Sequence, residues 1–106
     1  MERRITPRAR LGQTLWLNKH LDGFPYLAEV LELSEDGMVI RTIHEPSNHE
    51  STFTLELGIP GSAHRLWIWA ERVRQMGKLQ ALRIRYAELL DRAQIRQLVR
   101  WSSAAA

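Results

Sequence analysis

The fold is decided by residues 26–43, which read YLAEVLEL, SEDG and MVIRTI. Side chains of alternating character in residues 26–33 are typical of a strand, and this alternation puts Glu32 on the face opposite Leu31 and Leu33. Ser34 to Gly37 ends in Asp-Gly, which favours a tight turn, and the β-branched residues of 38–43 predict a second strand. Residues 26–43 are therefore predicted to form a β-hairpin with a polar turn.

Similar patterns extend outward from this hairpin. Four more strands are predicted at residues 15–17, 52–57, 65–75 and 79–86, with breaks rich in glycine, proline or polar residues between them. Six short strands with regular turns predict a mostly β protein, either a small antiparallel barrel or a sandwich. Trp67 and Trp69 share one face of their strand, and we interpret both, with Trp16, as residues that pack in the core.

The last segment changes from strand to helical character. Residues 88–101 lack glycine and proline, with acidic residues early and arginines late, as suits a helix dipole. We expect the apolar side of this helix to cover the β-structure, and residues 102–106 to form a flexible tail. That side comprises Leu90, Ile95, Leu98 and Trp101. Arg92, Arg96 and Arg100 form a stripe that fits a solvated face better than a partner surface.

Composition limits the functions to be considered. The length of 106 residues fits one domain, and without cysteine the chain has neither disulfides nor thiolate metal sites. No apolar run approaches the ~18 residues of a membrane span, so a cytoplasmic protein without membrane insertion is expected. The four histidines lack the spacing of a metal site, and Ser34 has no nearby base, so neither a metal nor enzyme activity is expected.

An arginine-rich arm precedes the first predicted strand. It reads Arg3-Arg4-Ile5-Thr6-Pro7-Arg8, within residues 1–11, and Pro7 disfavours a helix through Thr6. Thirteen of the fifteen basic residues are arginine, whose planar guanidinium suits phosphates and the acceptor edge of guanine. The arm is either a ligand-binding segment or a solvated tail.

In order and position, the arm and the polar turn resemble the two signatures of the PilZ domain family. Those signatures are Arg-Arg-x-x-x-Arg and, after a strand pair, Asp/Asn-x-Ser-x-x-Gly. The resemblance implies a domain over residues 12–101 that consists of a six-stranded antiparallel β-barrel and the C-terminal helix. It further implies a bacterial receptor for the second messenger cyclic di-GMP, without other cofactor, in motility or exopolysaccharide control. The implied ligand-binding residues are Arg3, Arg4, Arg8, Glu32, Ser34 and Gly37.

Glu32 departs from the family pattern, which has Asp or Asn there. The extra methylene moves the carboxylate about 1.5 Å further from the backbone, and loss of one charge-assisted hydrogen bond costs about 1.5–3 kcal/mol. Two functions therefore stay open. One is a receptor that relays cyclic di-GMP binding to an unidentified protein effector, and the other is a divergent adaptor that acts through protein contacts without the nucleotide. With a net charge of +3, nucleic acid is not expected as a partner.

Overall fold

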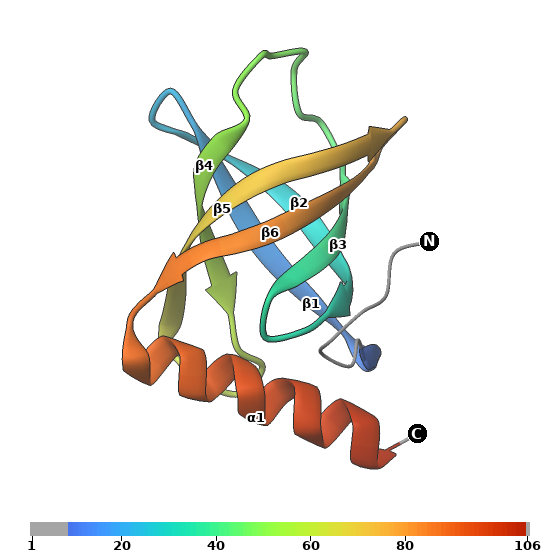
Figure 1. The fold of residues 1–106 in the computed structure, drawn as a ribbon, viewed down its shortest axis with the longest axis vertical. Coiled ribbons are helices and arrows are strands. Elements are labelled where there is room, and N and C mark those ends of the chain that lie inside the picture. The colour runs from blue at the N-terminus through green and yellow to red at the C-terminus, as the bar shows by residue number, and fades with distance from the viewer. Residues whose placement is uncertain (1–8, 106) are drawn as a thin grey trace.

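Six strands and a C-terminal helix make up the computed structural model, which describes residues 9–105 (Figure 1). The elements are β1 (Ala9–Leu21), β2 (Phe24–Leu33), β3 (Gly37–Thr42), β4 (Thr52–Gly58), β5 (Arg65–Met76), β6 (Leu79–Ala87) and α1 (Leu89–Ala105). All strand pairs are antiparallel, and the order β1-β2-β3-β6-β5-β4 closes on itself. The barrel alternative is therefore confirmed over the sandwich.

Regular structure extends into both terminal segments that were expected to lie outside the folded domain. β1 begins inside the segment assigned to the arm, because Ala9 and Arg10 pair with Leu33 and Glu32 of β2. α1 continues to Ala105, inside the segment expected to be a flexible tail. Neither glycine nor proline interrupts this end of the chain, and alanine has the highest helix propensity of all residues.

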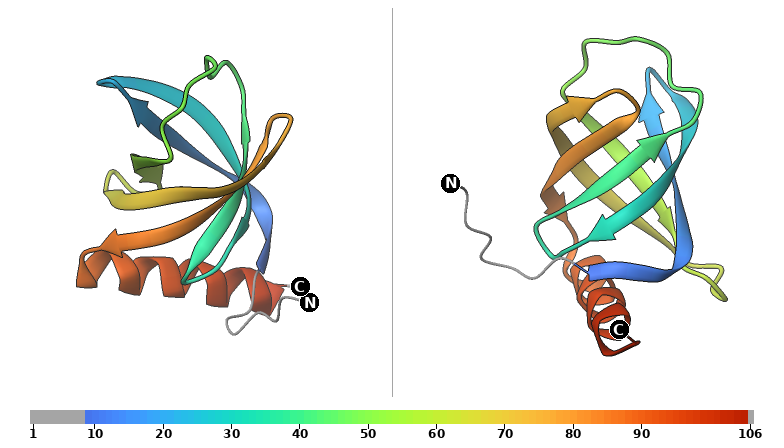
Figure 2. Two further views of the ribbon diagram at one scale, coloured as in Figure 1. Left: turned by 45° about the horizontal axis from the view of Figure 1, so that its top comes forward. Right: turned by 90° about the vertical axis from the view of Figure 1, so that its right-hand side faces the viewer.

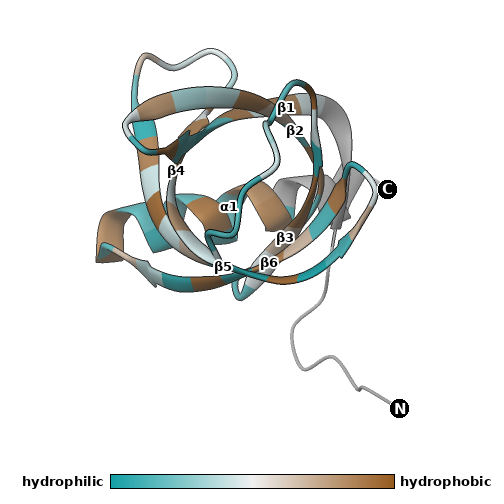
Figure 3. Ribbon diagram, turned by 90° about the horizontal axis from the view of Figure 1, so that it is seen from above, coloured by the Kyte–Doolittle hydropathy of each residue, from teal (hydrophilic) through white to brown (hydrophobic). Residues whose placement is uncertain are grey.

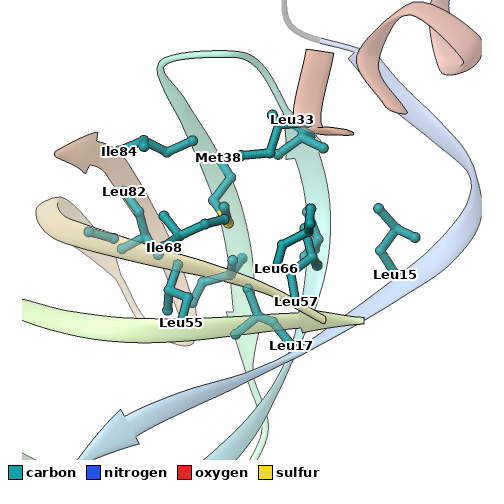
Figure 4. Packing of buried hydrophobic residues seen from close by; sticks show 14 of the residues in the cluster. Leu15, Leu17, Leu33, Met38, Leu55, Leu57, Leu66, Ile68, Leu82 and Ile84 are labelled. Atoms are coloured by element: carbon teal, nitrogen blue, oxygen red, sulfur yellow. The ribbon is translucent and has the colours of Figure 1, made fainter. Parts of the chain in front are cut away.

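The core fills the inside of the barrel, where side chains from all six strands converge (Figure 4). Fully buried examples are Leu17, Leu33, Ile40, Leu55 and Leu66. Burial of each such side chain contributes about 1.5–3 kcal/mol. Seen along the barrel, the hydropathy of successive residues changes along the strands (Figure 3). In β4, for example, Phe53, Leu55 and Leu57 are buried and alternate with residues that are not, as expected for a barrel wall.

The tryptophan prediction is wrong. Trp67 and Trp69 are 49% and 43% exposed, because β5 points Leu66, Ile68 and Ala70 into the barrel instead. Trp16 is exposed for the same reason, lying between the buried Leu15 and Leu17. Both faces of this part of β5 carry apolar side chains. The interior of a six-stranded barrel is narrow, so the face with the smaller side chains points inward.

Helix α1 lies across one end of the barrel (Figure 2). Ile95, Leu98 and Val99 are buried, and the Asp91 carboxylate Oδ2 accepts a hydrogen bond of 3.3 Å from the backbone N–H of Trp67. Asp91, Ile95 and Leu98 share one side of the helix, so Leu90 is turned away by about 100° and is exposed, contrary to expectation. Within residues 9–105, no helix has the length and apolar character needed to cross a membrane.

A buried lysine lies toward the opposite end. The Lys19 ammonium donates to Glu45 Oε2 at 3.0 Å and to Gln80 Oε1 at 2.8 Å, and it lies 4.0 Å from the centre of the Phe53 ring. Glu45 Oε1 also lies close to this ammonium, at 2.9 Å, so both carboxylate oxygens face the charge. Burial lowers the pKa of Lys19, and Glu45 opposes that shift. The pair joins the 43–51 loop to β1.

Candidate ligand-binding site

The turn between β2 and β3 is organised by the Ser34 side chain. Its hydroxyl donates to the Gly37 carbonyl at 3.2 Å and accepts from the backbone N–H groups of Gly37 and Asp36 at 3.1 and 3.3 Å. The Ser34 N–H also donates to the Gly37 carbonyl at 2.8 Å. A hydroxyl has one proton and two acceptor lone pairs, so these contacts use its full capacity. Ser34, which is buried, therefore holds the turn in shape.

Gly37 is required by the close approach of two strands. A Cβ added there would lie 2.4 Å from the backbone carbonyl oxygen of Leu82 on β6, and Gly37 pairs with Arg83 on that strand. Its backbone has no positive φ, so space and not backbone conformation selects glycine. The backbone N–H of Ile84 donates to the Asp36 carbonyl at 2.7 Å, which ties the turn to β6 a second time.

A β-bulge changes the orientation of residues near Glu32. Val30 pairs with Ile40 of β3 but Glu32 pairs with Val39, so Leu31 is an extra residue on β2. Leu31 and Glu32 are both partly exposed while Val30 and Leu33 are buried. The predicted opposition of Glu32 to Leu33 is confirmed, and its opposition to Leu31 is wrong because the simple alternation breaks at the bulge.

The three predicted arm residues, Arg3, Arg4 and Arg8, lie outside the described residues. The backbone that follows them is described, and it enters the barrel beside the turn. Ala9 pairs with Leu33, the residue immediately before Ser34, and Arg10 pairs with Glu32. Chain connectivity therefore places the start of β1 next to the part of β2 that leads into Glu32, Ser34 and Gly37.

The turn also contacts the helix. Glu35 Oε1 accepts a hydrogen bond of 2.6 Å from Arg96 Nε, in an ion pair whose two side chains are each about half exposed. These residues are 61 positions apart, so local patterns could not predict their pairing, although the stripe of Arg92, Arg96 and Arg100 predicts that Arg96 is exposed. Glu35 thus links the turn to α1, whereas Asp36 is hydrogen-bonded to β6 and Gly37 packs against that strand.

Chemically, this arrangement combines a rigid turn with an adjoining carboxylate. Glu32 supplies two acceptor oxygens, which suit paired N–H donors such as those of a guanine edge. Ser34 and Gly37 instead maintain the backbone that presents this carboxylate. Ser34 and Gly37 therefore have structural roles in the turn, and Glu32 contributes a partly exposed carboxylate beside it.

Comparison with known proteins finds similarity only in structure. No protein-family model and no curated protein matches the sequence. Among solved structures, the PilZ domain of YcgR from Escherichia coli, determined with c-di-GMP, has a TM-score of 0.77 at 15% identity, over 98% of this chain and 94% of that one. The inhibitor of motility MotI/DgrA from Bacillus subtilis has a TM-score of 0.74 at 14% identity, over 99% of this chain and 53% of that one.

A third neighbour comes from a different setting. The PilZ domain of CeSA from a cellulose-synthesizing bacterium has a TM-score of 0.65 at 14% identity, over 90% of this chain and 96% of that one. All three align with 90% or more of this chain, and their TM-scores show a common fold. The chain therefore has a PilZ-like fold.

Proposed function

We propose that this domain is a receptor for cyclic di-GMP, which binds between the arginine arm and the turn at residues 32–37. The observation that carries the proposal is the pairing of Ala9 with Leu33, which brings the end of the arm to the turn in a barrel that resembles a c-di-GMP-bound PilZ domain. The described residues that follow the arginine signature, Ala9 and Arg10, thus pair with the strand that leads into the turn.

The chemistry of the ligand suits the residues assigned to it. Cyclic di-GMP carries two phosphates and two guanines, and the guanidinium groups of Arg3, Arg4 and Arg8 are suited to the phosphates and to the O6/N7 edge. The Glu32 carboxylate is suited to accept from N1–H and N2–H of a guanine. Ser34 and Gly37 act by holding the turn, since the hydroxyl of Ser34 is already fully used within it.

The output of this receptor is contact with a protein effector. Binding orders the arm against the barrel, and the ordered arm then presents a new surface to the effector. The Glu35–Arg96 ion pair offers a second connection, from the turn to α1. Cyclic di-GMP acts as a signal and is not transformed, so no enzyme chemistry is assigned.

Isothermal titration calorimetry with cyclic di-GMP tests the proposal. Arg8→Ala should abolish binding, while Glu32→Asp should tighten it, because the shorter side chain restores the reach of the family's acid. Arg74→Ala, an exposed arginine on β5, is the matched control and should leave affinity unchanged. Equal affinity in all variants would refute the assigned site.

The second candidate is an adaptor of the same fold that does not bind the nucleotide. Two observations favour it: Glu32 replaces the shorter acid, and Ser34 has no unused hydrogen-bonding capacity for a ligand. Absence of heat at about 100 μM protein with excess ligand would support this adaptor and exclude the receptor.

A further inference from the structure

The outer side of the β5–β6 hairpin has a continuous surface that the ligand site does not use. Its residues are the outward-facing ones that lie opposite each other on the two strands, together with Trp67, which precedes Trp69 on the same face of β5. The pairs are Trp69–Tyr86, Glu71–Arg83, Arg74–Ala81 and Met76–Leu79. We call these residues the hairpin face. β5 and β6 lie side by side along the front of the barrel in Figure 1, and their turn is at the end away from α1.

Large apolar side chains are unusually exposed on this face. Trp67 and Trp69 are about half exposed, Tyr86 is 61% exposed and Met76 is 72% exposed, with Leu79 also exposed at the tip. Single exposed apolar residues need no explanation, but a series of them along one surface marks an interaction site. Tryptophan, tyrosine and arginine are also the residues that dominate binding energy in protein interfaces.

Charge is concentrated on the same hairpin. Residues 65–87 contain six basic residues and one acidic residue, so their net charge exceeds the +3 of the whole chain. The single acid, Glu71, already pairs with Arg85 at 3.2 Å. On the neighbouring strands, Glu56 is occupied by His20 at 3.2 Å and lies 3.9 Å from Arg65. The hairpin face thus presents cations that favour an acidic occupant.

Three occupants can be compared on these grounds. A second copy of the chain would bring two strongly basic hairpins together across a two-fold axis, which electrostatic repulsion disfavours. Single-stranded nucleic acid would use aromatic stacking and arginines, but the aliphatic tip at Met76 and Leu79 offers no stacking surface. An acidic protein segment with apolar side chains uses the aromatic end, the cations and the aliphatic tip together.

We propose that the hairpin face docks an acidic segment of a partner protein, whose apolar side chains pack on Trp67, Trp69 and Tyr86 and whose carboxylates meet Arg74 and Arg83. This surface does not require the nucleotide, so it serves either candidate function. It borders the turn nonetheless, since Arg83 pairs with Gly37 and the Ile84 N–H donates to Asp36.

The test uses the full chain, labelled with ¹⁵N, and a synthetic amphipathic peptide of about 15 residues with Leu and Phe on one side and Glu on the other. The same peptide with Lys in place of Glu is the control probe. We expect the acidic peptide to shift the amide resonances of residues 65–87 and the indole resonances of Trp67 and Trp69. The lysine peptide should leave them in place.

Variants separate the face from the rest of the barrel. Trp69→Ala should weaken peptide binding at least about tenfold, and the charge reversal Arg83→Glu should do the same and reduce the dependence on salt. Phe24→Ala removes an aromatic residue in the β1–β2 hairpin that is more exposed than Trp69, and it should change nothing. All replaced side chains are exposed, and the amide spectrum of each variant verifies that it is folded.

Several results would overturn the proposal. They are absence of shifts in residues 65–87 with the acidic peptide, equal binding of the lysine peptide, and equal affinity of Phe24→Ala and Trp69→Ala. Tighter binding of an oligothymidine of about 15 nucleotides would assign the face to nucleic acid instead. Concentration-dependent dimerisation lost in Trp69→Ala would assign it to a second copy. Either outcome replaces the acidic protein segment as the occupant, whether or not cyclic di-GMP binds.

Discussion

Replacement of Gly37 by alanine should destabilise the barrel through a clash between two strands. The added Cβ would lie 2.4 Å from the Leu82 carbonyl oxygen, about 1 Å closer than ordinary van der Waals contact. Because the obstacle is backbone, a side-chain rotation cannot relieve it, and β3 must move away from β6 next to the Gly37–Arg83 pair. Overpacking of this kind costs about 1–3 kcal/mol, and we expect the upper half of that range.

Thermal and urea unfolding measure this cost. A loss of about 2–3 kcal/mol should lower Tm by about 10–20 °C in a domain of this size. Gly58→Ala is the matched control, since its Cβ would meet the flexible end of Arg65 at 3.2 Å, and it should cost much less. If the two variants unfold at the same temperature, space between β3 and β6 is not the reason for glycine at position 37.

Three further predictions concern the turn and the buried lysine. Ser34→Ala should lower the free energy of unfolding by about 1–3 kcal/mol in urea titrations, because buried N–H groups of the turn lose their acceptor. Glu45→Ala should lower the free energy of unfolding by about 3–5 kcal/mol, because the Lys19 ammonium stays buried without its carboxylate. The double variant Lys19→Met, Glu45→Gln should lower it clearly less. Equal losses in the two variants would refute the pairing. Burial lowers the pKa of Lys19 in the folded protein below its unfolded value of 10.5, so the unfolded chain binds the proton more tightly. The free energy of unfolding should therefore rise as the pH rises from the folded to the unfolded pKa. Lys19→Met should remove that rise.

Much of the architecture could be predicted from local patterns. Alternation and turn residues located all six strands, and the lack of glycine and proline located the helix. The direction of side chains was harder to predict where both alternating sets are apolar. In β5, Leu66, Ile68 and Ala70 compete with Trp67 and Trp69 for the interior, and only closure of the barrel decides between them.

The candidate site, too, could be predicted only in part from local patterns. Asp36-Gly37 was read as turn chemistry, yet Gly37 has no positive φ and is required by its distance from Leu82. That contact links β3 to β6, which are distant in sequence, so local pattern could not reveal it. The bulge at Leu31 and the ion pair of Glu35 with Arg96 also depend on strand register and helix placement. The residue types of the turn were predictable, and their division into structural and chemical roles was not.

Titration of the ¹⁵N-labelled chain with cyclic di-GMP decides between the receptor and the adaptor, since it reports binding and its location together. We expect shifts in the amide resonances of residues 32–37 and of Arg83 and Ile84, which are bonded to the turn. The resonances of Met76 and Leu79, at the far tip of the hairpin, should stay in place. An unchanged spectrum at excess ligand, or shifts that avoid residues 32–37, would contradict the claim that this turn is the receptor site.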